Sequence, residues 1–93
     1  MKLKPINEQV VVVFGASSGI GRETALQFAR GGARVVVSAR GESGLNSVVE
    51  EIKAQGGDAL AVPADAGDFA QVEAVAKRAV EAYGQLDTWA HLA

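Results

Sequence analysis

The chain has 93 residues, 48% of them hydrophobic, which suits one compact globular unit and leaves no room for two domains. It contains no cysteine, which excludes a disulfide framework, a zinc cluster and a thiol nucleophile and fits a reducing cytoplasm. A formal net charge of -2 with both signs interspersed leaves no basic stripe for nucleic acid, and no apolar run approaches the length of a membrane span.

The chain begins with a predicted strand of about residues 9–14, an apolar run that contains four consecutive valines. A glycine-rich loop follows at residues 15–21. A helix is then predicted over about residues 20–30, and Gly31-Gly32 supplies the left-handed stop that commonly ends helices. The first three segments therefore read strand, glycine turn, helix.

A second strand is predicted over residues 34–39, where the β-branched run is continuous, as in parallel strands covered on both faces. A second helix is expected to begin at Ser43 as its N-cap and to end at Gly56-Gly57. Its apolar residues recur at helical spacing, namely Leu45, Val48, Val49 and Ile52.

A third strand is predicted over residues 59–63, and a third helix follows, with Asp68 as its N-cap and Gly84 as its end. One face of that helix carries the apolar residues Phe69, Val72, Val75, Ala76, Ala79, Val80 and Tyr83. Residues 86–93 begin a fourth strand. The order is thus β-α-β-α-β-α-β.

Because such crossovers are almost always right-handed, we expect an α/β fold with three layers and a parallel sheet of strand order 3-2-1-4. The first two helices should then cover one face of the sheet and the third helix the other. We expect the sheet to be truncated after the fourth strand, with one face only half covered.

The loop Gly-Ala-Ser-Ser-Gly-Ile-Gly at residues 15–21 predicts a dinucleotide site. A helix N-terminus presents unpaired N–H groups and the positive end of the helix dipole, and glycine lets a diphosphate come close. The glycines are Gly15, Gly19 and Gly21, and we expect the last two to be needed for that approach. A P-loop is excluded because Gly21 is followed by Arg22 and Glu23 instead of Lys and Ser or Thr.

The end of the second predicted strand favours NADP(H) over NAD(H). Dinucleotide folds usually carry an Asp or Glu there, which grips the adenosine ribose, but this chain has Ala39 followed by Arg40. A guanidinium at this place suits a 2′-phosphate, and Ser17 and Ser38 are candidates for additional hydroxyl donors. The alternative is that Arg40 is a solvated loop arginine and that the serines only satisfy backbone groups.

Asp65 follows the third predicted strand, at the carboxyl edge where open α/β sheets bind ligands. Its carboxylate could accept a hydrogen bond from an adenine amino group, or it could simply stabilise its own loop.

Together these residues closely resemble the N-terminal half of a classical short-chain dehydrogenase/reductase. The resemblance rests on the loop at residues 15–21, the Ala39-Arg40 ending, Asp65 and the segment at residues 86–89, and it covers nearly the whole chain. It implies a Rossmann fold, a nicotinamide cofactor and hydride transfer between an alcohol and a ketone. It places along the phosphates Ser17, Ser18, Ile20 and Gly21, and at the adenine Asp65 and the backbone of Ala66.

The resemblance also has departures. Where the family has Asn-Asn-Ala-Gly after the fourth strand, this chain reads His91-Leu92-Ala93. Family catalysis uses a tyrosine followed four residues later by a lysine, whereas Tyr83, the only tyrosine, is followed at that spacing by Asp87. His91 and Trp89 are interpreted first as structural residues, so no catalytic residue and no metal ligand is predicted.

We therefore expect residues 1–93 to be the dinucleotide-binding part of a larger domain that binds NADP(H) and, in a longer parent, a small alcohol or ketone. Oligomers are expected only for that parent. The alternatives are a dinucleotide-sensing or interaction module without chemistry, and a remnant whose glycine loop survives only for structural reasons.

Overall fold

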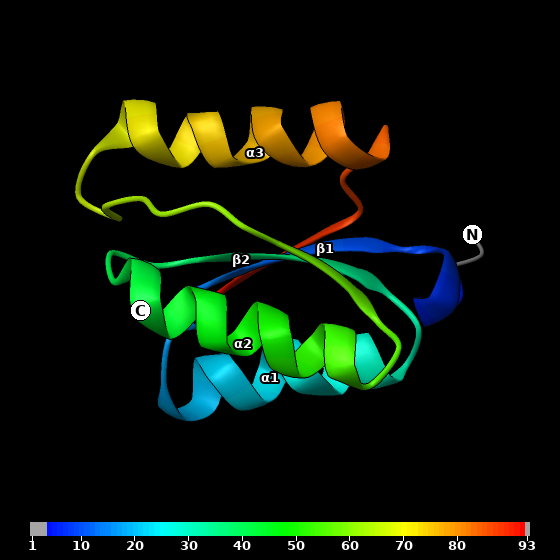
Figure 1. Cartoon of the computed structure of the whole chain (residues 1–93). Coiled ribbons are helices and arrows are strands. Elements are labelled where there is room, and N and C mark those ends of the chain that lie inside the picture. The colour runs from blue at the N-terminus through cyan, green and yellow to red at the C-terminus, as the bar shows by residue number, and fades with distance from the viewer. Residues whose placement is uncertain (1–3, 93) are drawn as a thin grey trace.

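The computed structural model describes residues 4–92 and has the predicted alternation of strands and helices (Figure 1). A short 3-10 helix, η1, precedes the first strand. The elements in chain order are η1 Ile6–Glu8, β1 Val10–Phe14, α1 Gly19–Arg30, β2 Arg34–Ser38, α2 Glu42–Ala54, β3 Asp58–Ala61, α3 Phe69–Tyr83 and β4 Thr88–His91.

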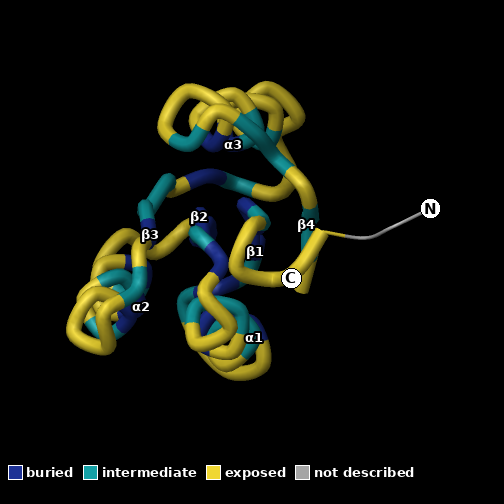
Figure 2. The backbone as a smooth tube through the Cα atoms, turned by 90° about the vertical axis from the view of Figure 1, so that its right-hand side faces the viewer, coloured by how far each residue is buried: buried dark blue, intermediate teal, exposed yellow. Residues whose placement is uncertain are grey.

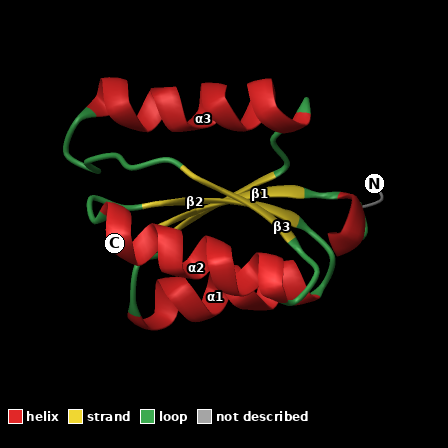
Figure 3. Ribbon diagram, in the orientation of Figure 1, coloured by secondary structure: helices red, strands yellow, loops and turns green. Residues whose placement is uncertain are grey.

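The four strands form one parallel sheet of order β3-β2-β1-β4, which confirms the predicted topology. In the register, Val12 lies between Val36 on β2 and Trp89 on β4. Helices α1 and α2 cover one face and α3 covers the other, as Figures 2 and 3 show. The three predicted layers are therefore present.

The continuous valine run of β1 is buried on both sides because each face of the sheet has its own core. Val11 and Val13 pack toward α1 and α2, together with residues of those helices such as Leu26 and Leu45. Phe14 and the other alternate residues of β1 pack toward α3, where Val75 is fully buried. Alternation along the strand thus builds two cores from one apolar sequence.

The predicted cap of α3 is confirmed. Oδ1 of Asp68 accepts the backbone N–H groups of Ala70 at 3.0 Å and Gln71 at 3.3 Å. At the other end, Gly84 has a left-handed φ of 80° and closes the helix.

The predicted cap of α2 is wrong. The helix begins at Glu42 with Gly41 in the N-cap position, so Ser43 lies inside the first turn. The Gly41 carbonyl accepts the N–H of Leu45 at 3.2 Å, and this early start leaves Leu45 fully buried. Packing of the apolar face outweighed the capping preference of a serine hydroxyl.

The predicted apolar face of α3 is only partly buried. Val75 and Ala79 face the sheet, whereas Phe69 is 78% exposed and Val80 is 48% exposed. Phe69 is the first residue of the helix, next to its cap. Val80 instead lines a shallow groove on the flank of α3 beside Leu86.

Strand β4 is shorter than predicted, and Ala93 of that prediction lies outside the described residues. Backbone pairing nevertheless extends past both of its ends. The Asp87 N–H donates to the Val10 carbonyl at 2.9 Å, and the Leu92 N–H donates to the Phe14 carbonyl at 2.8 Å. Trp89 packs as predicted, with its ring centroid 6.2 Å from that of Phe14.

Candidate functional site

A cavity of about 400 Å³ opens at the carboxyl edge of the sheet, where β1, β2 and β3 end. This is the edge at which open α/β sheets bind ligands. Five of the predicted site residues lie together in its lining, which consists of Phe14, Gly15, Ser17, Ala39, Arg40, Gly41, Asp65 and Ala66.

The glycine loop is anchored to the second strand by backbone hydrogen bonds. The Gly15 N–H donates to the Ser38 carbonyl at 2.7 Å, and the Ala16 N–H donates to the same oxygen at 3.2 Å. Gly15 has a φ of 90°, a conformation that favours glycine. The loop is thus held in place before any ligand arrives.

The first turn of α1 follows the glycine loop directly and carries unpaired backbone donors, although residues 18–21 are not in the cavity lining. Ser18 occupies the N-cap position without a side-chain cap, and the first intrahelical hydrogen bond runs from the Arg22 N–H to the Ser18 carbonyl at 3.3 Å. The N–H groups of Gly19, Ile20 and Gly21 therefore precede that bond and are available to an anion. The Ile20 side chain is 78% exposed beside them.

Gly19 and Gly21 have different environments. Gly19 has a φ of 60°, and a Cβ added there would meet no atom within 4 Å. Gly21 is buried, and a Cβ added there would lie 1.8 Å from the Gly15 carbonyl oxygen. The expectation that both glycines let a diphosphate come close stays a prediction, and at Gly21 the missing side chain also lets α1 pack directly on the loop.

Ser38 does not face the cavity. Its side chain is 0% exposed, and its hydroxyl donates to the Val62 carbonyl at 2.6 Å. The expectation that Ser38 adds a donor to a phosphate is therefore corrected: the hydroxyl joins β2 to the chain that follows β3. Its place in a continuous buried strand was the sequence signal for a structural role.

Ser17 lies in the cavity lining and also contacts α2. A Cβ added at Gly44 would lie 3.0 Å from the Ser17 Cβ, so a small residue at position 44 lets the first turn of α2 approach the loop. Sequence analysis missed both Gly41 and Gly44. The contact between α2 and the loop joins segments that only the folded chain brings together.

Arg40 is exposed at the cavity rim, directly after the buried Ala39. Within residues 4–92, no ion pair or side-chain hydrogen bond engages its guanidinium. The guanidinium is therefore available to pair with a phosphate bound in the cavity.

Asp65 serves its own loop and lines the cavity as well. Its Oδ1 accepts the Gly67 N–H at 2.8 Å, and its backbone N–H donates to Oε1 of Gln71 at 2.8 Å. The loop-stabilising alternative is therefore observed, although the carboxylate keeps further acceptor capacity toward the cavity.

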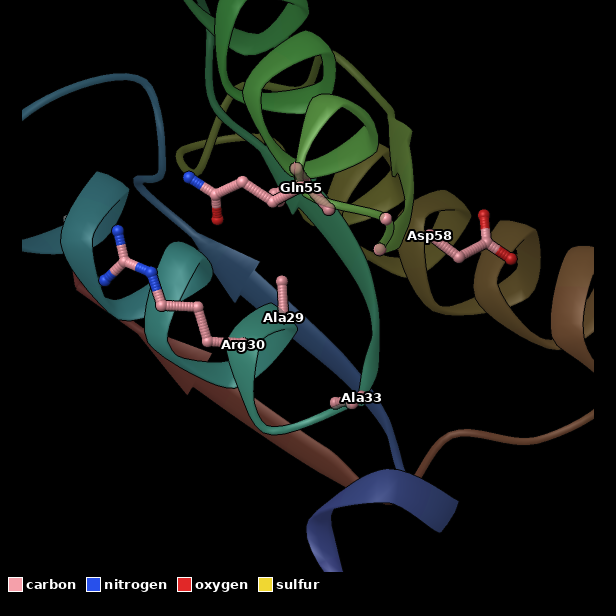
Figure 4. Close-up of a pocket in the computed structure, with 9 residues that line it drawn as sticks. Ala29, Arg30, Ala33, Gln55 and Asp58 are labelled. Atoms are coloured by element: carbon pink, nitrogen blue, oxygen red, sulfur yellow. The ribbon is translucent and has the colours of Figure 1, made fainter.

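A second cavity, of about 440 Å³, lies at the opposite edge of the sheet, beside the turns that follow α1 and α2. Figure 4 shows Arg30 and Gln55 extending to one side there, while the Asp58 carboxylate points away from them. None of the predicted site residues lies in its lining.

Tyr83 lies near that second edge, where its hydroxyl donates to Oδ1 of Asp58 at 3.1 Å. Burial, the hydrogen bond to Asp58 and the charge of Asp58 together raise the pKa of Tyr83 to about 12. The Arg34 guanidinium stacks over its ring at 5.5 Å. A phenol so protonated is unsuited to acid/base chemistry near neutral pH, in agreement with the sequence analysis.

Within residues 4–92, no group of three or more His, Cys, Asp or Glu side chains is arranged to hold a metal ion. No helix in that range combines the length and the apolar character needed to cross a bilayer.

Comparison with known sequences matches residues 9–92 to the short chain dehydrogenase family. An oxidoreductase of Bacillus subtilis, YxnA, is 45% identical over 89 residues, which are 96% of this chain and 25% of the relative. L-rhamnose 1-dehydrogenase (NAD(P)(+)) of Azotobacter vinelandii is 49% identical over 84 residues, which are 86% of this chain and 33% of that enzyme. The chain thus spans a quarter to a third of these two relatives.

Solved structures with a similar fold come from the same kind of enzyme as these sequence relatives. A hydroxysteroid dehydrogenase from Escherichia coli superposes with a TM-score of 0.89 at 34% identity, covering 95% of this chain and 39% of that one. A variant of actinorhodin polyketide ketoreductase with NADPH superposes with a TM-score of 0.87 at 38% identity, covering 91% of this chain and 33% of that one. With a family match over nearly its whole length and the family's fold, this chain belongs to the short-chain dehydrogenases, a family of oxidoreductases that use a nicotinamide dinucleotide.

Proposed function

We propose that this chain is the cofactor-binding part of a short-chain oxidoreductase that prefers NADP(H) and interconverts an alcohol and a ketone. The observation that carries the preference is the cavity rim, where Arg40 is uncommitted and Ala39 stands in place of a ribose-binding carboxylate. An Asp or Glu at that position would repel a 2′-phosphate, whereas a guanidinium attracts it.

In this proposal the adenosine half of the cofactor occupies the carboxyl-edge cavity. Asp65 and the backbone of Ala66 meet the adenine, and Arg40 with the Ser17 hydroxyl meets the 2′-phosphate. The diphosphate lies at the first turn of α1, against the N–H groups of residues 19–21. Ser18 and Gly15 shape that loop, and Ser38 is left out because its hydroxyl is already engaged.

The proton chemistry of the proposed reaction requires residues beyond these 93. Tyr83 is near the opposite edge of the sheet and is bonded to Asp58. For the longer protein we propose a small alcohol or ketone as the substrate. Any oligomeric assembly and a cytoplasmic location are also proposed for that longer protein. Support for such a protein comes from the relatives, of which this chain spans only a part.

The proposal is tested by calorimetry of 2′-phospho-AMP and AMP with the protein as it is encoded. A charge-assisted arginine–phosphate pair contributes about 1.5–3 kcal/mol, so 2′-phospho-AMP should bind roughly 10- to 100-fold more tightly. Arg40→Ala should remove most of that ratio. Arg30→Ala is the matched control, because Arg30 lines the cavity at the other edge. Equal affinities for the two nucleotides in the wild type would contradict the proposed preference.

A further inference from the structure

Gly44 lies in the first turn of α2, although glycine is among the residues that a helix disfavours most. The structure shows what the missing side chain makes room for. A Cβ added at Gly44 would lie 3.0 Å from the Ser17 Cβ and 3.3 Å from the Ser17 carbonyl oxygen, closer than ordinary van der Waals contact. Helix α2 therefore meets the glycine loop at Ser17, a residue that lines the carboxyl-edge cavity.

Helix α2 is held in place on two sides. Toward the sheet, Leu45 and Ile52 are fully buried. Toward α1, which lies beside it in Figure 2, the Glu51 carboxylate pairs with the Arg22 guanidinium at 2.7 Å. Gly44 lies two helical turns before Glu51 and hence on the same side of α2. The helix cannot move away from the loop without disturbing both the core and this ion pair.

Ser17 is the less constrained partner in this contact. The backbone hydrogen bonds that anchor the glycine loop to β2 come from Gly15 and Ala16, which precede it. Hydroxyl groups elsewhere between residues 4 and 92 are engaged in hydrogen bonds, but none of the bonds in that range involves the Ser17 hydroxyl. A side chain at position 44 would therefore displace Ser17 before it displaces α2.

The cavity lies between the two segments that this contact holds together. Ser17 lines it from the glycine loop, whereas Arg40 and Gly41 line it from the chain that leads into α2. In the proposed function, the Ser17 hydroxyl and the Arg40 guanidinium meet the same 2′-phosphate. Because hydrogen bonds weaken steeply with distance and misalignment, the spacing between the loop and α2 determines whether both groups reach that phosphate.

We propose that Gly44 is a positioning residue for the 2′-phosphate, because it lets α2 approach the loop and keeps the Ser17 hydroxyl beside the phosphate that Arg40 binds. This inference rests on the proposed function. Gly44 is not itself part of the cavity lining, so it acts through Ser17. The proposed adenine contacts, Asp65 and Ala66, belong to a different loop. A side chain at position 44 should therefore weaken binding of the 2′-phosphate selectively.

The test is calorimetric titration of 2′-phospho-AMP and AMP on the protein as it is encoded. Gly44→Ala should lower the ratio of the two affinities about three- to tenfold, the effect of losing one hydrogen bond, and should change AMP affinity less than about twofold. Alanine is favoured over glycine in a helix, so the variant is expected to fold, as circular dichroism will check. Gly57→Ala is the matched control. Its added Cβ would lie 2.8 Å from Cγ2 of Ile52, at the opposite edge, and the wild-type ratio should persist.

A double variant separates an effect through Ser17 from a general disturbance of the fold. Ser17→Gly removes the hydroxyl and also the Cβ that Gly44→Ala would meet, so it should lower the ratio by itself. Adding Gly44→Ala to it should then change the ratio by less than about twofold. An unchanged ratio in Gly44→Ala or in Ser17→Gly, or a full further loss in the double variant, would overturn the role of Gly44 alone. Equal affinities for the two nucleotides in the wild type would overturn the proposed cofactor preference with it.

Discussion

The Asp87 carboxylate accepts the backbone N–H of Val10 at 2.8 Å, and the Asp87 N–H donates back to the Val10 carbonyl at 2.9 Å. This reciprocal pair joins the first residue of β1 to the residue that precedes β4. The same carboxylate accepts the Lys4 ammonium at 2.8 Å and the Gln85 amide at 2.7 Å. One side chain thus fixes the register at which the two strands begin.

This arrangement predicts an acid-sensitive stability. The hydrogen bond from Lys4 and that from the Val10 N–H hold the pKa of Asp87 at about 2, below its ordinary value of 3.8. Because the pKa is lower in the folded state, the stabilisation is complete above about pH 4 and disappears as the pH falls through about 2.

Asp87→Asn should lower the urea midpoint of unfolding at pH 6 and flatten its decline between pH 4 and pH 2, measured by circular dichroism. Glu50→Gln, a change to an exposed carboxylate on α2, is the control and should keep the wild-type profile. An Asp87→Asn profile that fell as steeply as the wild type's would argue against this assignment.

Gly21→Ala should destabilise the fold. The added Cβ would lie 1.8 Å from the Gly15 carbonyl oxygen, a backbone atom of the loop that is anchored to β2 through the Gly15 N–H, so α1 or the loop must move. Overpacking of this kind costs about 3 kcal/mol, measurable by chemical denaturation. Gly41→Ala, where an added Cβ meets no atom within 4 Å, provides the comparison and should be far milder. Equal costs at the two positions would contradict the packing role of Gly21.

Gly19→Val should reduce dinucleotide affinity more than it reduces stability. Gly19 has a left-handed φ of 60° with open space above it, so the branched side chain would fill the space proposed for the diphosphate. Gly56→Val is matched in strain, since Gly56 has a φ of 86° and equally open surroundings, but it lies at the opposite edge. Both variants should lose about 1–2 kcal/mol of stability, and only Gly19→Val should lose binding, by more than about tenfold. Equal dinucleotide affinities of Gly19→Val and Gly56→Val in calorimetric titrations would contradict the proposed position of the diphosphate.

Ser38→Ala should destabilise the protein without changing dinucleotide affinity. Removing the hydroxyl leaves the Val62 carbonyl without its 2.6 Å hydrogen bond, which costs about 1–2 kcal/mol. Ser43→Ala, at an exposed position in α2, should change the unfolding free energy by less than about 0.5 kcal/mol. A loss of dinucleotide affinity in Ser38→Ala without a loss of stability would show that the Ser38 hydroxyl contributes to binding.

The 93-residue chain studied by itself should bind the dye ANS. Ile6 and Ile20 line an apolar groove of about 430 Å³ on the outer side of α1, and Val80 and Leu86 line another on α3. Exposed patches of this kind favour dye binding and association. Ile20→Ser should reduce the fluorescence, whereas Asn46→Ser, at an exposed polar position, should not. A monodisperse chain without dye binding would contradict this expectation.

Sequence alone gave the elements and the topology because local patterns determine them. The valine runs, the glycine loop and the Asp68 cap each depend on residues close together in the chain. The contacts that redefined the site are long-range: the Ser38 hydroxyl reaches Val62, and Gly44 adjoins Ser17. No periodicity encodes such pairs, since they depend on how neighbouring strands and helices meet.

The same distinction explains the errors. Ser43 has the chemistry of a cap, but the position of Leu45 against the sheet determined where α2 begins. Tyr83 does pack on the predicted face of α3, but its pairing with Asp58 and Arg34 required the folded arrangement of α3, β3 and β2.

The contact between Gly21 and Gly15 has a consequence for how the glycine motif is interpreted in other chains. The last glycine of the motif is required by the first, through a carbonyl oxygen that leaves no room for a side chain. That requirement comes from the helix meeting the loop and is independent of any bound molecule. A descendant that had lost its nucleotide would still need glycine at this position, and Gly19 would still favour glycine because of its φ of 60°. Among these positions, only Arg40 would be free to change once binding is no longer selected.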